Sequence, residues 1–242
     1  SGGAACAVAV GLTACAPPPP RFDHRVPVGT TSGPAVTAAK TEPVPTPTVP
    51  TMRLVPLVPL VSSYIPFGEA RKQETAAYSL RHYGDETWRL TPTMVVLHYT
   101  AGESWLGARD TFAADLRDLG ELPGTCAHYL VDRDGTVHAL VPVTIRCRHT
   151  IGLNDRAIGV EVVQPGRDDP EQADREILAR APQREALLAL VRQLMAQHHI
   201  PATSVIGHAM ANRDPHFHDL RGWRNDHVDW QQPDVIAFRA LL

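Results

Sequence analysis

The chain has 242 residues, of which 43% are hydrophobic and 20% charged, and its formal net charge is −3. This composition fits a folded domain with an appendage and excludes disorder along the whole chain. The small negative charge argues against nucleic acid as the main partner, and the sequence lacks the run of 18 apolar residues that would predict a transmembrane helix.

The first residues have the character of a secretory signal. Small and apolar residues run over 4–14 and end at Cys15. The tetrapeptide Leu-Thr-Ala-Cys at 12–15 resembles the box at which bacterial lipoproteins are cut and lipidated. We therefore expect residues 1–15 to be a signal remnant, with a lipid on Cys15 and Cys6 removed. The alternative is a stretch of small residues with an incidental cysteine.

The next segment is rich in proline. Twelve of the 22 prolines lie between Pro17 and Pro59. Proline fixes φ and removes a backbone donor, so the segment favours extended polyproline II and does not build a core. We predict a semi-rigid linker over residues 16–61, the alternative being an irregular part of the domain that follows. The remaining residues, 62–242, form the predicted domain.

The pattern of the predicted domain is that of an α/β protein. Apolar periodicity predicts helices at residues 69–83, 105–119, 182–198 and 233–242. Short β-branched runs predict strands at 93–99, 157–163 and 203–206, and a hairpin of 127–131 and 136–141 around an Asp-Gly turn. Because hairpin and helix-separated connections both occur, we expect a mixed central β-sheet flanked by helices.

Two of the predicted strands end in a histidine, His98 in VVLHY and His208 in VIGH. Side chains at the carboxyl ends of buried strands meet where α/β proteins bind ligands. One such histidine alone is more often structural, but the sequence Asp-His-Val-Asp at 226–229 offers further ligands. Zinc needs three protein ligands and an open position for water. The pattern therefore favours a zinc site, although no HExxH motif is present.

Four motifs carry a resemblance to a known family. They are LHYTAG (97–102), AHYLVDRDGTVHALV (127–141), RHTIGLNDRAIGVEV (148–162) and VIGHAMANRDPHFHDLRGWRNDHVDW (205–230). In order and spacing the chain resembles the zinc-dependent N-acetylmuramoyl-L-alanine amidases of the type 2 family, which share the fold of peptidoglycan recognition proteins and T7-type lysozyme. The resemblance covers about residues 90–242, the core of the predicted amidase domain.

The resemblance implies an enzyme that hydrolyses the amide between N-acetylmuramic acid and L-alanine in peptidoglycan. By position it implies Zn²⁺ held by His98 and His208, and a water activated by Glu161. The residues support this role for Glu161, because a carboxylate on an apolar strand has a raised pKa unless it is paired. Such a group suits a general base. The alternative is that Glu161 is bridged to an arginine.

The third ligand is ambiguous, because the chain lacks the family's D/C-P-G motif. We choose His227 first and Asp226 second, with Asp229 and His218 as further alternatives. Arg224 is expected to take the family's basic role and to stabilise the oxyanion of the reaction.

Three more residues fall on motif positions with which the family tends to line its groove. His128, His149 and Asn154 are expected to contact substrate or to support the metal ligands. Cys126 and Cys147 could pair in an exported protein, but the sequence leaves their pairing open.

The competing interpretation is a peptidoglycan recognition module that holds muropeptide without zinc and without catalysis. A weaker one is a zinc peptidase that cuts within the stem peptide. Because the chain keeps a ligand-rich set, we favour the amidase. We expect a monomer that is exported to the bacterial cell envelope, takes peptidoglycan or muropeptide as substrate, reaches the membrane through the lipid on Cys15 and has no nucleic-acid partner.

Overall fold

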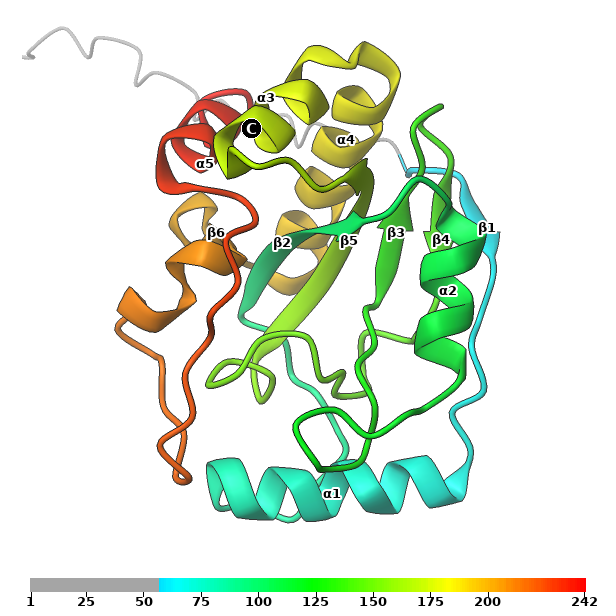
Figure 1. The fold of residues 1–242 in the computed structure, drawn as a ribbon, viewed down its shortest axis with the longest axis vertical. Helices are drawn as coiled ribbons and strands as arrows, with labels where there is room; N and C mark the ends of the chain where they lie inside the picture. The colour runs from blue at the N-terminus through cyan, green and yellow to red at the C-terminus, as the bar shows by residue number, and fades with distance from the viewer. Residues whose placement is uncertain (1–56) are drawn as a thin grey trace, which may run out of the picture. The chain divides into compact units, whose positions relative to one another are not determined.

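The structure is a computed structural model, and it describes residues 57–242 (Figure 1). The predicted signal remnant with Cys15, and most of the predicted linker, lie outside the described residues. In the described part of the chain, no helix is both long and apolar enough to span a bilayer.

Six strands of residues 57–242 form one sheet in the order β1-β4-β3-β5-β2-β6. They are β1 (Leu60–Ser62), β2 (Met94–Ala101), β3 (Tyr129–Val131), β4 (Val137–Ala139), β5 (Ala157–Pro165) and β6 (Val205–Gly207). The β3–β4 hairpin is antiparallel, and the other neighbours in this sheet pair in parallel. The mixed central sheet predicted from the sequence is confirmed.

Helices lie on both sides of this sheet (Figure 1). They are α1 (Glu69–Tyr83), α2 (Trp105–Ala113), α3 (Pro170–Ala179), α4 (Ala181–His198) and α5 (Gln232–Arg239). Buried residues of α3, α4 and α5 share one core cluster with the sheet, whereas α2 packs against a second cluster. Helix α1 crosses the lower end of the molecule in Figure 1.

The two central strands present different chemistry on their two faces, because successive side chains of a strand alternate. Val95 and Leu97 of β2 pack into the cluster that includes α4, as do Val160 and Val162 of β5. His98 is paired in register with Glu161 of β5, so both side chains point to the opposite face. That face carries the site described below.

Apart from shifts at the ends of several elements, the structure departs from the predicted elements in three places. The helix predicted over 105–119 ends at Ala113, because the chain turns at Asp115, which has a φ of 51°. The Asp115 carboxylate accepts a hydrogen bond from the Gly124 N–H at 2.8 Å and pairs with Arg71 at 3.1 Å. Helix α3 was not predicted, and β1 includes the last two residues of the predicted linker.

Candidate metal centre and active site

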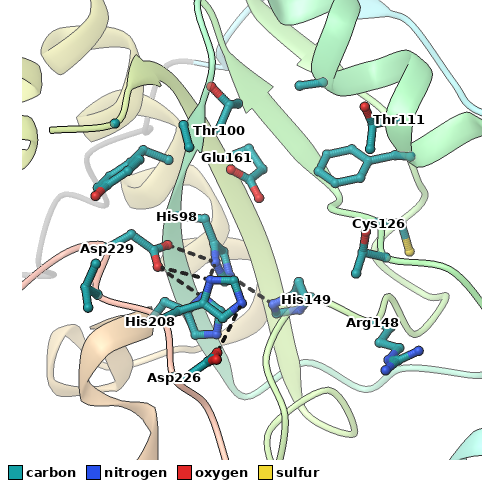
Figure 2. A pocket seen from close by; sticks show the side chains of 18 residues that line it. His98, Thr100, Thr111, Cys126, Arg148, His149, Glu161, His208, Asp226 and Asp229 are labelled. Atoms are coloured by element: carbon teal, nitrogen blue, oxygen red, sulfur yellow. Dashed lines mark hydrogen bonds and ion pairs between the residues drawn. The ribbon is translucent and has the colours of Figure 1, made fainter. Parts of the chain in front are cut away.

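A cavity of about 520 Å³ lies at the carboxyl ends of β2 and β5 (Figure 2). Its walls come from these two strands and Gly166 after β5, from α2, and from His208 directly after the last strand of the sheet. Three loops contribute the rest, residues 125–126, 148–149 and 226–229. Cavities at this position of an α/β sheet are the usual ligand sites.

Three buried side chains converge in this cavity, His98, His208 and Asp229. The two Nδ1 atoms of the histidines lie 3.0 Å apart. The Asp229 carboxylate lies 3.3 Å from His98 Nδ1 and 3.2 Å from His208 Nδ1. Figure 2 shows the three groups pointing at one another. One ligand atom from each therefore faces a common point.

Strand pairing brings the two histidines together. β2 and β6 are parallel neighbours with Leu97 opposite Gly207, so the residues that follow, His98 and His208, emerge side by side. Gly207 is required here, because a Cβ atom at this position would lie 1.9 Å from the carbonyl oxygen of Trp230.

A hydrogen bond at Nε2, the ring nitrogen of His208 that points away from the cavity, fixes the tautomer of the ring. His208 Nε2 lies 2.9 Å from the side-chain oxygen of Asn225. The amide nitrogen of Asn225 donates to the carbonyl of Ile151, which sets the orientation of the amide. Because the Asn225 oxygen only accepts, His208 Nε2 carries a proton, and in the neutral ring it is Nδ1 that presents a lone pair to the cavity.

A hydrogen bond to a second histidine, His149, sets the tautomer of His98 in the same way. His149 Nε2 donates to the carbonyl of Ala157 at 3.2 Å, so His149 Nδ1 is an acceptor. His98 Nε2 lies 3.1 Å from that acceptor and donates to it. His98 Nδ1 therefore also presents a lone pair. Burial lowers the pKa of His98 to about 4 and holds the pKa of His149 well below its ordinary value, so both rings are neutral near pH 7.

The charge on Asp229 completes this donor set. Burial opposes its ionisation, but the two histidine rings beside it hold the pKa of Asp229 far below its usual range. Two imidazole nitrogens and one carboxylate face one another at these distances. They are the ligand types that a catalytic zinc site uses, so the residues present fit Zn²⁺.

Glu161 lies in the same cavity beside this donor set. Its Oε2 atom is buried and has no hydrogen-bond partner among the described residues. Burial, followed by the nearby Asp229 charge, raises the pKa of Glu161 to about 8. Within residues 57–242 no arginine pairs with it, so the salt-bridge alternative finds no support there.

The structure does not bring our first choice for the third ligand into the converging group. His227 lies at the edge of the cavity with a side chain that is 61% exposed, and its ring stacks on that of His208 with centroids 4.2 Å apart. The Asp226 side chain is fully exposed. Asp229 is the buried residue of this segment, and its carboxylate occupies the third position.

Four other predicted site residues lie outside the cavity lining. The backbone oxygen of Asn212 accepts a hydrogen bond from Arg224, and His218 packs edge-on against Tyr83. His128 is fully buried between the carbonyl of Ile145 and the N–H of Gly159. Asn154 Oδ1 accepts the N–H groups of His149 and Thr150, so it shapes the loop that carries His149.

Sequence reasoning missed three residues that support the converging group, Asn225, Asp174 and Trp230. Asn225 gave no signal in the sequence. Asp174 gave one, because it stands on the apolar stripe of α3 beside Ala173 and three residues before Ile177, all of which are buried. A charged residue on such a stripe needs a specific partner.

Cys126 and Cys147 form a disulfide, with Cα atoms 5.2 Å apart. The sequence had left this pairing open. Cys126 lines the cavity, and its N–H donates to the carbonyl of Arg148 at 3.0 Å. The bond therefore joins the start of the hairpin to the loop that carries His149.

A family match agrees with this geometry. Residues 88–218, more than half of the chain, match the family described as N-acetylmuramoyl-L-alanine amidase (Amidase_2). The chain therefore belongs to the N-acetylmuramoyl-L-alanine amidase family, and the prediction of an amidase that acts on peptidoglycan is confirmed at this level. Among curated proteins, none matches the chain.

Several solved structures are similar to the chain. The amidase LysC from Clostridium intestinale is 21% identical, with 62% of this chain and 87% of that chain covered and a TM-score of 0.43. A mutant endolysin from Bacillus subtilis is 18% identical, with 63% and 84% covered and a TM-score of 0.43. The amidase AmiD from E. coli, in complex with an anhydro-muropeptide substrate, is 22% identical, with 51% of each chain covered and a TM-score of 0.40.

Proposed function

We propose that this protein is a zinc hydrolase that cleaves the amide between N-acetylmuramic acid and L-alanine in peptidoglycan. The ligands are His98, His208 and Asp229, and Glu161 is the general base. One observation carries the proposal: the donor atoms of three buried residues face a common point beside a buried carboxylate oxygen that has no partner.

Zinc bound there acts as a Lewis acid and lowers the pKa of water to about 7. Glu161 takes the proton from the water whose oxygen adds to the amide carbon. It holds this proton on its buried carboxyl group and returns it to the amide nitrogen as the carbon–nitrogen bond breaks. The products are the lactyl carboxylate and the free amine of L-alanine. A pKa raised by burial suits both halves of this transfer.

The hydrogen bonds behind the ligands support this assignment. Asn225 and His149 hold the outer nitrogens of the two histidines, so both rings keep the tautomer that ligation requires. We expect His149 to act through His98 rather than by touching substrate, because its ring nitrogens are engaged by His98, Thr150 and Ala157.

The protein acts outside the cytoplasm, in the bacterial cell envelope, where its substrate lies. The Cys126–Cys147 disulfide supports this location, because such bonds persist in oxidising compartments. A lipid on Cys15 and a monomeric state remain predictions from the sequence.

The test is mass spectrometry of the products released from purified peptidoglycan, with and without a chelator. We expect free stem peptides that begin at L-alanine, lost on chelation and restored by zinc. Glu161→Gln should lower this activity by roughly 10²–10⁴-fold. Glu185→Gln serves as the matched control, because Glu185 is exposed on α4 away from the cavity.

Other products would contradict the proposal in different ways. Cleavage within the stem peptide would make the protein a peptidase. Binding of muropeptide without any product would make it a recognition module, which is the alternative that the sequence raised.

A further inference from the structure

The residue after Asp229 has an unusual backbone. Trp230 is fully buried, yet its φ is +56°, in the left-handed region that bulky side chains rarely adopt. Such a conformation persists only where the surroundings hold it, and it is concentrated at functional sites. Groups next to Trp230 must therefore hold its backbone in this conformation.

A carboxylate on α3 holds the backbone at Trp230 by hydrogen bonds. The two oxygens of Asp174 accept hydrogen bonds from consecutive backbone groups, the N–H of Trp230 at 3.0 Å and the N–H of Gln231 at 2.6 Å. Successive N–H groups around a left-handed residue form a concave anion site. Asp174 itself is fully buried and forms no salt bridge within residues 57–242. Burial raises the pKa of Asp174 to about 7, and the hydrogen bonds from these two backbone groups oppose that rise and favour the carboxylate.

The segment held by Asp174 touches the backbone beside each converging ligand. The carbonyl of Asp229 accepts the N–H of Ala209, the residue after His208, at 2.9 Å. The indole N–H of Trp230 donates to the carbonyl of His98 at 3.1 Å. The carbonyl oxygen of Trp230 also lies so close to Gly207, the residue before His208, that a Cβ atom at Gly207 would be 1.9 Å from it. A shift of this segment would therefore move all three ligands relative to one another.

We propose that Asp174, acting through Trp230, is a positioning residue for the metal centre. It holds the backbone of residues 230–231 so that the Asp229 carboxylate stays between His98 and His208. This inference rests on the zinc site proposed above. Asp174 touches neither substrate nor metal in this assignment.

The chemistry of the contact requires a carboxylate. An asparagine has one acceptor oxygen, and its amide group would face a backbone N–H as one donor against another. Asp174→Asn therefore loses one of the two hydrogen bonds while it keeps the shape of the side chain. Asp234→Asn is the matched control, because Asp234 is a buried carboxylate near the same segment with one oxygen that lacks a partner among the described residues.

The experiment measures the zinc dissociation constant of the folded, full-length protein by competition with a chelator, at a temperature where each variant is folded by circular dichroism. We expect Asp174→Asn to weaken zinc binding by roughly 10–100-fold, the range typical of residues that orient metal ligands. Asp234→Asn should stay within about twofold of wild type. The visible spectrum of bound Co²⁺ should change in Asp174→Asn, since it depends on coordination geometry.

A second variant keeps the test decisive if Asp174→Asn does not fold. Trp230→Phe retains a ring in the core but removes the donor to the His98 carbonyl, and it should weaken zinc binding in the same direction. If wild type binds zinc but these variants bind it as Asp234→Asn does, the positioning role is overturned and the zinc hydrolase stands. If wild type binds no zinc, the proposed metal centre fails and this inference fails with it.

Discussion

The choice of the third ligand depends on which way one side chain points. His227, Val228 and Asp229 are consecutive in the chain, and Asp229 is buried while the other two are exposed. A histidine is as good a zinc ligand as an aspartate, so the residue types alone cannot decide. The inward orientation of Asp229 decides it in favour of the carboxylate.

This orientation predicts different effects for two substitutions. Asp229→Ala should weaken zinc binding by more than about 100-fold, beyond the loss typical of a supporting residue. His227→Ala should change the zinc dissociation constant by less than about threefold, because its exposed ring stacks on His208 without joining the converging group. Competition with a chelator measures both constants. The reverse order of effects would restore His227 as the ligand.

Burial of Glu161 predicts a pH dependence of stability in the metal-free protein. Its pKa is about 8 in the folded state and near 4.5 when unfolded, so the folded state binds the proton more tightly between these values. The free energy of unfolding of wild type should therefore fall as the pH rises through this window. Glu161→Gln has no carboxylate to ionise, so it should lose less stability, by a few kcal/mol at most.

Urea denaturation of both proteins in the presence of EDTA, from about pH 5 to about pH 9, measures this difference. Parallel curves for wild type and Glu161→Gln would mean that the carboxylate is solvated, and they would remove the main physical argument for a general base.

At the scale of the elements, the sequence predicted the central strands and the longest helices well. The apolar stripe of α4 and the β-branched runs of β2 and β5 are local patterns that packing reinforces. Helix α2 was predicted too long, because apolar residues continue past its end, yet Leu116 and Leu119 are exposed. The turn at Asp115 depends on Arg71, which is distant in sequence and could not be anticipated.

The site residues, like the elements, could be predicted from local sequence patterns but not where contacts between distant segments decide. His98, His208 and Glu161 could be predicted because each stands at a motif position on a strand or directly after one. Asp229 was one of four alternatives, since the sequence does not tell which residue of a loop faces inward. The supporting contact of Asp174 joins α3 to a segment 56 residues further along the chain. No spacing rule predicts such a contact.

The disulfide gives the loop that carries His149 a fixed end. Cys126 and Cys147 close a loop with a sequence separation of 21, for which loss of the bond should cost about 3 kcal/mol. The double variant Cys126→Ala, Cys147→Ala should be less stable than wild type by this amount in urea denaturation. Adding a reductant should lower the stability of wild type and leave the variant unchanged. Equal stability of wild type with and without reductant, once thiol titration shows reduction, would contradict the prediction.

For the molecule as a whole, the metal centre joins parts that are distant in sequence. His98 lies on a central strand, His208 follows the edge strand β6, and Asp229 lies in the loop before α5. A ligand that binds only the folded state stabilises all of these parts together. Zinc at 100 times its dissociation constant should add about 2.7 kcal/mol to the free energy of unfolding.

For a chain of this size that gain corresponds to a rise in Tm of roughly 5–10 °C, which differential scanning calorimetry can measure. Asp229→Ala should unfold at the same temperature with and without zinc, because the third ligand from the C-terminal loop is missing. The matched control, Asp234→Asn, should keep the zinc-dependent rise, since its carboxylate is buried near the same loop but lies outside the converging group. A zinc-dependent rise that survives in Asp229→Ala would mean that the metal stabilises the protein from a different site, and the centre at His98, His208 and Asp229 would have to be abandoned.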